Sequence, residues 1–250
     1  MAIAPPKTHN SRRGEIIRFL IFRTIGNFLI LFTIFGILAT FGPALFYEAQ
    51  YKVAQIFHIH YSVASTKEDG PSELGKLLVK MREEPQARES LLGSIMRGDT
   101  EKVLIPDSAK FSVVIPKIGA NEKVQENVDP NNEEEYLRVL QGSVAHARGS
   151  AFPGLNGTTY LFAHSADSFW NVGRYNAVFY LLNKLEVGDG VTIFYNNERY
   201  EYLVKKTEIV SADDTHYMAS NIGQGERIIL QTCWPPGTAW KRLLVFAEPN

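Results

Sequence analysis

The stretch GVTIFYNNERYEYLVKKTEIV, residues 190–210, decides the fold class. It contains two runs, 190–195 and 199–210, rich in the β-branched and aromatic residues that favour strands. Asn196 and Asn197 stand between the runs, and asparagine tolerates the left-handed backbone that a two-residue turn needs. The sequence therefore predicts an antiparallel β-hairpin at this point.

Further strand-like runs lie on both sides of the hairpin, separated by turn residues. They are FSVVIPKI (111–118), TTYLFAH (158–164), ERIILQTC (226–233) and RLLVFAE (242–248). Short helices are expected at 132–140, where Asn132 is the candidate N-cap, and at 176–185. Residues 104–250 are therefore predicted to be mainly β, forming a closed or nearly closed barrel with short helices.

Composition excludes several classes of protein. The chain has 250 residues and a formal net charge of −1, which gives no footprint for nucleic-acid binding. Its 45% hydrophobic content excludes wholesale disorder. A single cysteine, Cys233, can form neither an internal disulfide nor a cysteine zinc cluster.

The near-zero net charge conceals an uneven distribution of charge near the N-terminus. Residues 1–23 carry five basic residues against one acidic residue, and the next 24 residues (24–47) are uncharged. As a helix this run spans ~36 Å, enough for a ~30 Å hydrocarbon core. We interpret it as one transmembrane helix, with the basic N-terminus in the cytoplasm and the C-terminal part outside.

Two other interpretations of this run fit the sequence less well. A cleaved signal usually has a shorter apolar core and a small-residue cleavage site, which Ala39-Thr40-Phe41 matches poorly. A buried core helix needs apolar partner helices, and the chain has no comparable run.

The predicted organisation has four parts. Residues 1–23 form a cytoplasmic tail, 24–47 a transmembrane signal-anchor, 48–103 a juxtamembrane linker with a helix, and 104–250 a catalytic domain. The linker helix is expected at 72–98, and its apolar face suggests that it packs on the barrel and restricts access to a cleft.

Cys233 is the candidate nucleophile. It ends a strand-like run and precedes the turn-rich segment Trp234-Pro235-Pro236-Gly237, a place where a scaffold presents reactive groups. His164 also stands at a strand end, and Arg242 opens the strand that follows. An imidazole can generate a thiolate, and a guanidinium can stabilise an oxyanion.

This ordered trio resembles the sortases, the cell-surface cysteine transpeptidases of bacteria. Leu230-Gln231-Thr232-Cys233 matches the last four positions of the family's T-L-x-T-C strand, and Phe162-Ala163-His164-Ser165 is similar to its histidine motif. Arg242-Leu243-Leu244-Val245 resembles the arginine strand of class C and D members, so the motif spacing is most similar to classes C, D and E. Class C sortases often carry an N-terminal lid with an aspartate followed by an aromatic residue. The sequence before residue 111 has no such pair, which weakens the assignment to a pilin polymerase.

The resemblance implies a sortase-type barrel and a two-step acyl transfer without metal or organic cofactor. Cys233 would attack an LPxTG-like sorting signal, His164 would act as general acid or base, and Arg242 would hold the substrate. An amine of a cell-wall precursor or a pilin would then accept the protein. Ser165, Thr232 and Trp234 are candidate substrate-binding residues, the protein is expected to be bacterial and membrane-bound, and no nucleic acid is expected as a partner.

Two alternatives stay open at this stage. An L,D-transpeptidase would place a histidine close before the cysteine, whereas the nearest one here is His216. A catalytically silent, membrane-tethered binding or assembly module would keep the barrel without its activity.

Overall fold

The computed structural model describes residues 9–63, 100–165, 179–218 and 225–250. The chain divides into two compact units, Met1–Pro43 and Ala44–Asn250, and each is described by itself. The predicted linker helix at 72–98 lies outside the described residues, as do residues 176–178 of the second expected helix.

The first unit is helical. The helix α1 (His9–Ile56) begins there and continues into the second unit. Its segment Gly14–Leu38 has a mean hydropathy of 1.9, and its most apolar window has no buried residue. By length and composition this segment could cross a membrane. It begins before the predicted span 24–47 and ends inside it.

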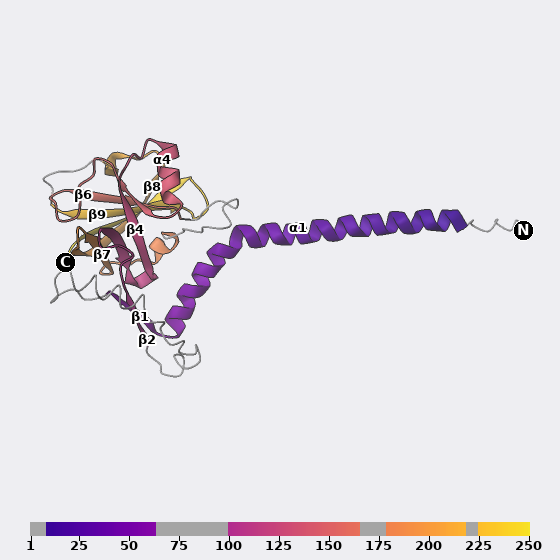
Figure 1. The fold of residues 1–250 in the computed structure, drawn as a ribbon, viewed down its shortest axis with the longest axis horizontal. Coiled ribbons are helices and arrows are strands. Elements are labelled where there is room, and N and C mark those ends of the chain that lie inside the picture. The colour runs from indigo at the N-terminus through magenta and orange to yellow at the C-terminus, as the bar shows by residue number, and fades with distance from the viewer. Residues whose placement is uncertain (1–8, 64–99, 166–178, 219–224) are drawn as a thin grey trace, which may run out of the picture. The chain divides into compact units, whose positions relative to one another are not determined.

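The second unit is built on a closed eight-stranded barrel (Figure 1). The order around the barrel is β10-β8-β7-β3-β4-β5-β6-β9. Two neighbouring pairs, β4 with β5 and β6 with β9, run parallel, and the other pairs run antiparallel. The strands are β3 (Phe111–Ile115), β4 (Ala120–Val128), β5 (Val144–Ala147), β6 (Thr158–Phe162), β7 (Gly190–Tyr195), β8 (Glu198–Ser211), β9 (Arg227–Trp234) and β10 (Lys241–Pro249).

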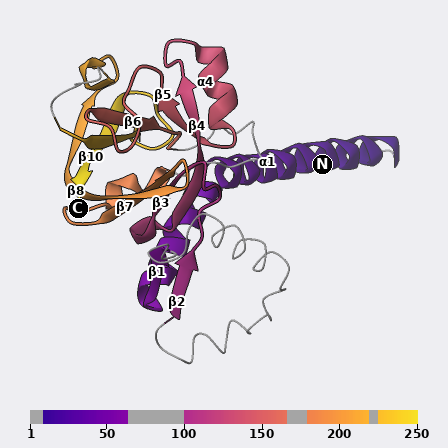
Figure 2. The same cartoon turned by 60° about the vertical axis from the view of Figure 1, so that its left-hand side comes forward.

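Smaller elements surround the barrel. A two-stranded parallel sheet pairs β1 (Ile59–Val63) with β2 (Thr100–Leu104). The helix α4 (Glu133–Leu140) lies beside β4 and β5 (Figure 2). The described residues of the unit also include three 3₁₀ helices: η1 (Pro116–Ile118), η2 (Tyr180–Lys184) and η3 (His216–Met218).

The predicted mainly β barrel is confirmed, and all six strand-like runs contribute to it. Asn196 and Asn197 form the two-residue turn, with φ of 51° and 67°, and Tyr195 pairs with Glu198. The cap of α4 is also as predicted, because the Asn132 side chain accepts a hydrogen bond from the Glu135 N–H at 3.1 Å. The other expected helix, 176–185, is a 3₁₀ helix where it is described.

Four strands were not predicted, namely β1, β2, β4 and β5. The sequence of β4, ANEKVQENV, carries polar or charged residues at most positions and buries only Ala120, Val124 and Val128. β5 has four residues, too few for a period to show, although all four are buried. β4 and β5 owe their conformation to pairing with their neighbours in the closed barrel, whereas β1 and β2 pair with each other outside it.

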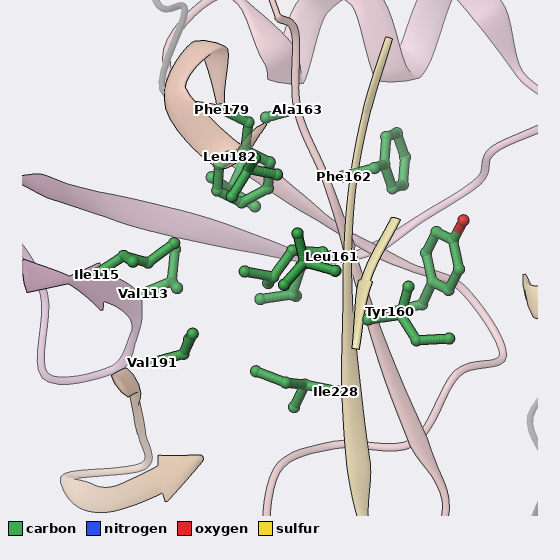
Figure 3. Close-up of a cluster of buried hydrophobic side chains, with 14 of the residues drawn as sticks. Val113, Ile115, Tyr160, Leu161, Phe162, Ala163, Phe179, Leu182, Val191 and Ile228 are labelled. Atoms are coloured by element: carbon green, nitrogen blue, oxygen red, sulfur yellow. The ribbon is translucent and has the colours of Figure 1, made fainter. Parts of the chain in front are cut away.

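The core explains why β6, which has the sequence TTYLF, carries no charged residue and no exposed position. Figure 3 shows Leu161 and Ala163 on the side of this strand that faces Leu182 and Phe179, and Tyr160 and Phe162 on its other side. All five residues of β6 are buried. A strand that is covered on both faces does not alternate between apolar and charged residues.

The loop before β6 is anchored by His146, which is fully buried. Its Nδ1 accepts a hydrogen bond from the Asn127 N–H at 3.3 Å, so Nε2 carries the proton and faces the Ala151 carbonyl at 3.0 Å and the Ser150 hydroxyl at 2.9 Å. The ring stacks on Phe152 with centroids 4.5 Å apart. Burial lowers the pKa of His146, which keeps the ring neutral.

Candidate active site

Strand register brings Cys233, His164 and Arg242 to one edge of the barrel. In the parallel pair of β6 and β9, Phe162 is the partner of Gln231, and the Ala163 N–H donates to the Gln231 carbonyl at 3.1 Å. Two residues beyond these partners, the chains reach His164 and Cys233. On the other side of β9, Arg242 is the direct partner of Cys233. The three predicted residues therefore lie on adjacent segments, with the cysteine in the middle.

Cys233 and its partner Arg242 also lie on one face of the sheet. Side chains alternate along a strand, so Gln231 and Cys233 share a face, while Leu230 and Thr232 share the opposite one. The Tyr160 hydroxyl donates to the Gln231 amide oxygen at 2.5 Å, which joins the same face of β6 to that of β9. We call this surface of β6, β9 and β10 the cysteine face. Cys233 is partly exposed on it.

The cysteine face is electrostatically coupled to the tyrosines around it. Burial raises the pKa of Tyr160, and the positive charge of Arg242 opposes that shift. Burial likewise raises the pKa of Tyr136 on α4, Glu133 adds to the shift, Arg242 opposes it and Cys233 adds a smaller increase. The charge of the guanidinium therefore acts on the pKa of both tyrosines.

Arg242 is held at the start of β10. Its Nη1 donates to the carbonyls of Ala239 and Lys241, each at 3.1 Å. A guanidinium has five N–H donors, so these contacts fix the group without using all of its hydrogen-bonding capacity.

The three candidate substrate-binding residues have different environments. Thr232 is buried, and its hydroxyl donates to the Ala163 carbonyl at 3.1 Å, which ties β9 to the segment that carries His164. Ser165 is buried as well. Trp234 is partly buried and packs against the core. Trp234 is thus the most accessible of the three.

Three residues near the site were not singled out from the sequence. Tyr160 stands four positions before His164, and Gln231 stands two positions before Cys233. Both separations are even, so strand alternation applied to the two motifs would have placed them on the same face. Tyr136 contacts Phe162 edge-on, with ring centroids 6.3 Å apart. No sequence signal indicates this contact, because it depends on where α4 packs.

Within the described ranges, no group of three or more histidine, cysteine, aspartate or glutamate side chains is arranged to hold a metal ion. The exposed His216 contacts one carboxylate, that of Asp214, through its Nδ1.

A closed barrel that sets a thiol between a histidine and an arginine defines a class of cysteine proteins. The sortase-domain profile matches residues 113–250, and this chain belongs to the sortase family. Sortases are surface transpeptidases that sort proteins to the cell wall, and the resemblance drawn from the motifs is confirmed.

Three individual proteins are similar to this chain. Sortase D of Bacillus subtilis (strain 168) is 26% identical over 189 residues, which cover 74% of this chain and 85% of the relative. Sortase C1 of Streptococcus agalactiae is 30% identical with a TM-score of 0.46, covering 56% of this chain and 66% of that one. The Clostridium perfringens sortase D5 transpeptidase is 23% identical with a TM-score of 0.46, covering 73% and 90% of the two chains.

Proposed function

We propose that this protein is a membrane-anchored cysteine transpeptidase that cleaves an LPxTG-like sorting signal and transfers the protein to an amine. The observation that carries the proposal is the register that sets Cys233 between Arg242, its direct partner, and the segment of His164. Family membership supports the same reaction class.

The proposed reaction has two acyl-transfer steps. The Cys233 thiolate attacks the threonine carbonyl of the sorting signal, and the tetrahedral intermediate collapses as the C–N bond breaks. His164 gives its proton to the leaving amine, and a thioester remains on Cys233. The incoming amine then attacks the thioester, loses a proton to His164 and releases the thiolate.

Arg242 supplies the electrostatic part of this mechanism. Its guanidinium starts the strand next to Cys233 and keeps donors available after binding two backbone carbonyls. We assign these donors to the developing oxyanion and to a substrate carbonyl. Trp234, which follows Cys233, is the candidate wall of the substrate site. The buried residues Ser165 and Thr232 would support the site from the inside of the barrel.

The partners follow from the reaction class. We propose sorting-signal proteins as donors and an amine of a cell-wall precursor or a pilin as acceptor. The apolar segment of α1 is the proposed single-pass anchor, with the N-terminus in the cytoplasm and the barrel outside. The similarity to sortase D favours a class D-like enzyme.

Mass spectrometry tests the proposal directly. The full chain in detergent is incubated with an LPxTG peptide without an amine acceptor, and we expect a thioester adduct on Cys233. Cys233→Ala should abolish the adduct, whereas His216→Ala, which alters an exposed histidine, should retain it. An unmodified Cys233 and intact peptides across a sorting-signal library would instead favour the catalytically silent binding module.

A further inference from the structure

A cavity of about 510 Å³ lies apart from the cysteine face. It is lined by the C-terminal part of α1, by β1, by η1 with the start of β4, and by Leu181 of η2. All of these residues belong to the unit Ala44–Asn250. None of His164, Cys233 and Arg242 lines it, and β4 is separated from β9 by β5 and β6 around the barrel.

The cavity contains one carboxylate of unusual character. Glu122 is half-buried, and burial together with the charge of Asp107 raises its pKa to about 7, while Lys123 acts in the opposite direction. The lysine that also lines the cavity, Lys117, is already paired with Asp189 at 3.6 Å and with Glu186 at 3.9 Å. Over the ranges that the structure describes, no salt bridge neutralises Glu122.

Tyrosine rings form much of the remaining wall. Tyr47 and Tyr51 come from α1 and Tyr61 from β1. The Tyr61 ring lies 3.5 Å from the point where a Cβ on Gly119 would stand. The pKa of Tyr47 is raised by burial and by the charge of Glu122, and both residues line the cavity. Aromatic faces attract cations, and Tyr51 already has the Lys184 ammonium 5.8 Å from its centroid.

We propose that this cavity binds a primary ammonium group of an organic ligand. The Glu122 carboxylate accepts hydrogen bonds from the ammonium, and the tyrosine rings cover its methylene groups. The same chemistry is offered by a soluble amine and by an amine-bearing lipid headgroup. The site stands independently of the proposed transpeptidation, because it uses none of the residues assigned to that reaction.

Binding should depend on pH through the groups around the cavity. Glu122 must be ionised, and with a pKa of about 7 its ionised fraction falls from about nine tenths at pH 8 to about one tenth at pH 6. His58, His60 and Lys117 also line the cavity, and the charges of Asp107 and Lys123 act on Glu122. Affinity therefore falls as pH falls, by about tenfold from Glu122 alone.

Calorimetric titration of the full chain in phosphatidylglycerol nanodiscs with cadaverine tests the site. We expect saturable binding at pH 8 that Glu122→Gln weakens about tenfold or more, because a charge-assisted hydrogen bond is lost. Glu126→Gln is the matched control, since Glu126 lies on the same strand outside the cavity, paired with Lys110. It should bind cadaverine like the wild type, and so should Cys233→Ala, even if the protein proves to have no transpeptidase activity.

The second arm separates the two ligand sources. If a lipid headgroup is the natural ligand, nanodiscs containing phosphatidylethanolamine should weaken cadaverine binding, and Glu122→Gln should abolish that competition. Unchanged binding would assign the site to soluble amines. Equal affinity of Glu122→Gln and the wild type, no saturable binding of cadaverine, or binding of inorganic phosphate in its place would overturn the proposal.

Discussion

The residues of the candidate site are ordinary when taken singly. One partly exposed cysteine, one loop histidine and one arginine at a strand start occur in many proteins. Their motifs could be recognised in the sequence, and the register that sets Arg242 opposite Cys233 gives them a common location. Tyr136 could not be found in this way, because its contact with Phe162 is set by helix packing.

Replacing Arg242 by lysine keeps a positive charge but removes the planar fork of donors. We expect kcat/KM for an LPxTG peptide to fall about 100-fold or more, the scale of losing an oxyanion donor. Steady-state kinetics of peptide cleavage measure the effect. Lys241→Ala, which removes the exposed cation next to Arg242, should change kcat/KM only slightly. A fall of similar size in both variants would contradict the assignment.

His146 predicts a pH dependence of stability. Its pKa is lowered in the folded protein, so the unfolded chain binds a proton more readily at acidic pH. Its contribution to stability is present at neutral pH and is lost as pH falls through the unfolded value near 6.5. Urea midpoints at pH 7.5 and 5.5 should differ less in His146→Gln than in the wild type. In the exposed-site control His216→Ala, the difference should persist.

At the scale of elements, the strands rich in β-branched and aromatic residues were predictable from the sequence, and the polar strands were not. The hairpin at 196–197 and the cap of α4 depend on local chemistry, so a single sequence reveals them. β4 and β5 depend on partners that are distant in the chain, and their own residues carry little strand signal. Closure of the barrel, rather than local propensity, sets their conformation.

The hairpin gives a test at this scale. Asn197 has a φ of 67°, and an alanine there would pay the steric cost of the left-handed region. We expect Asn197→Ala to lower the free energy of unfolding by about 1 kcal/mol. Asn197→Gly should retain the wild-type value within about 0.5 kcal/mol, because glycine adopts this backbone readily. Urea denaturation followed by circular dichroism measures both, and equal losses would refute the turn geometry.

The cap of α4 gives a second test. Asn132→Ala removes the acceptor for the Glu135 N–H and should cost about 1 kcal/mol, whereas Asn132→Ser should keep most of the stability. Because α4 carries Tyr136 over the cysteine face, the alanine variant should also lose peptide cleavage at temperatures just below its melting point. Thermal unfolding and cleavage assays read the two effects.

At the scale of the whole molecule, the apolar segment of α1 and the barrel are separate units. The proposed orientation predicts which parts of the chain a membrane-impermeant thiol reagent reaches. In a Cys233→Ala background, Lys205→Cys on β8 should react in intact cells, and Ser11→Cys should react only after permeabilisation. The reverse pattern would show the opposite orientation, and reaction of both in intact cells would argue against an anchored N-terminus.

The parallel pairing of β6 with β9 has a consequence for the order in which the protein matures. Partners in this pair are 69 positions apart, as Phe162 and Gln231 are, and Arg242 follows later still. During synthesis and export, the histidine segment appears well before the thiol, and the thiol before the guanidinium. Contacts between such distant segments form late in folding. The trio is therefore completed only when β10 closes the barrel, and a chain that stops short of β10 carries a cysteine without the arginine beside it.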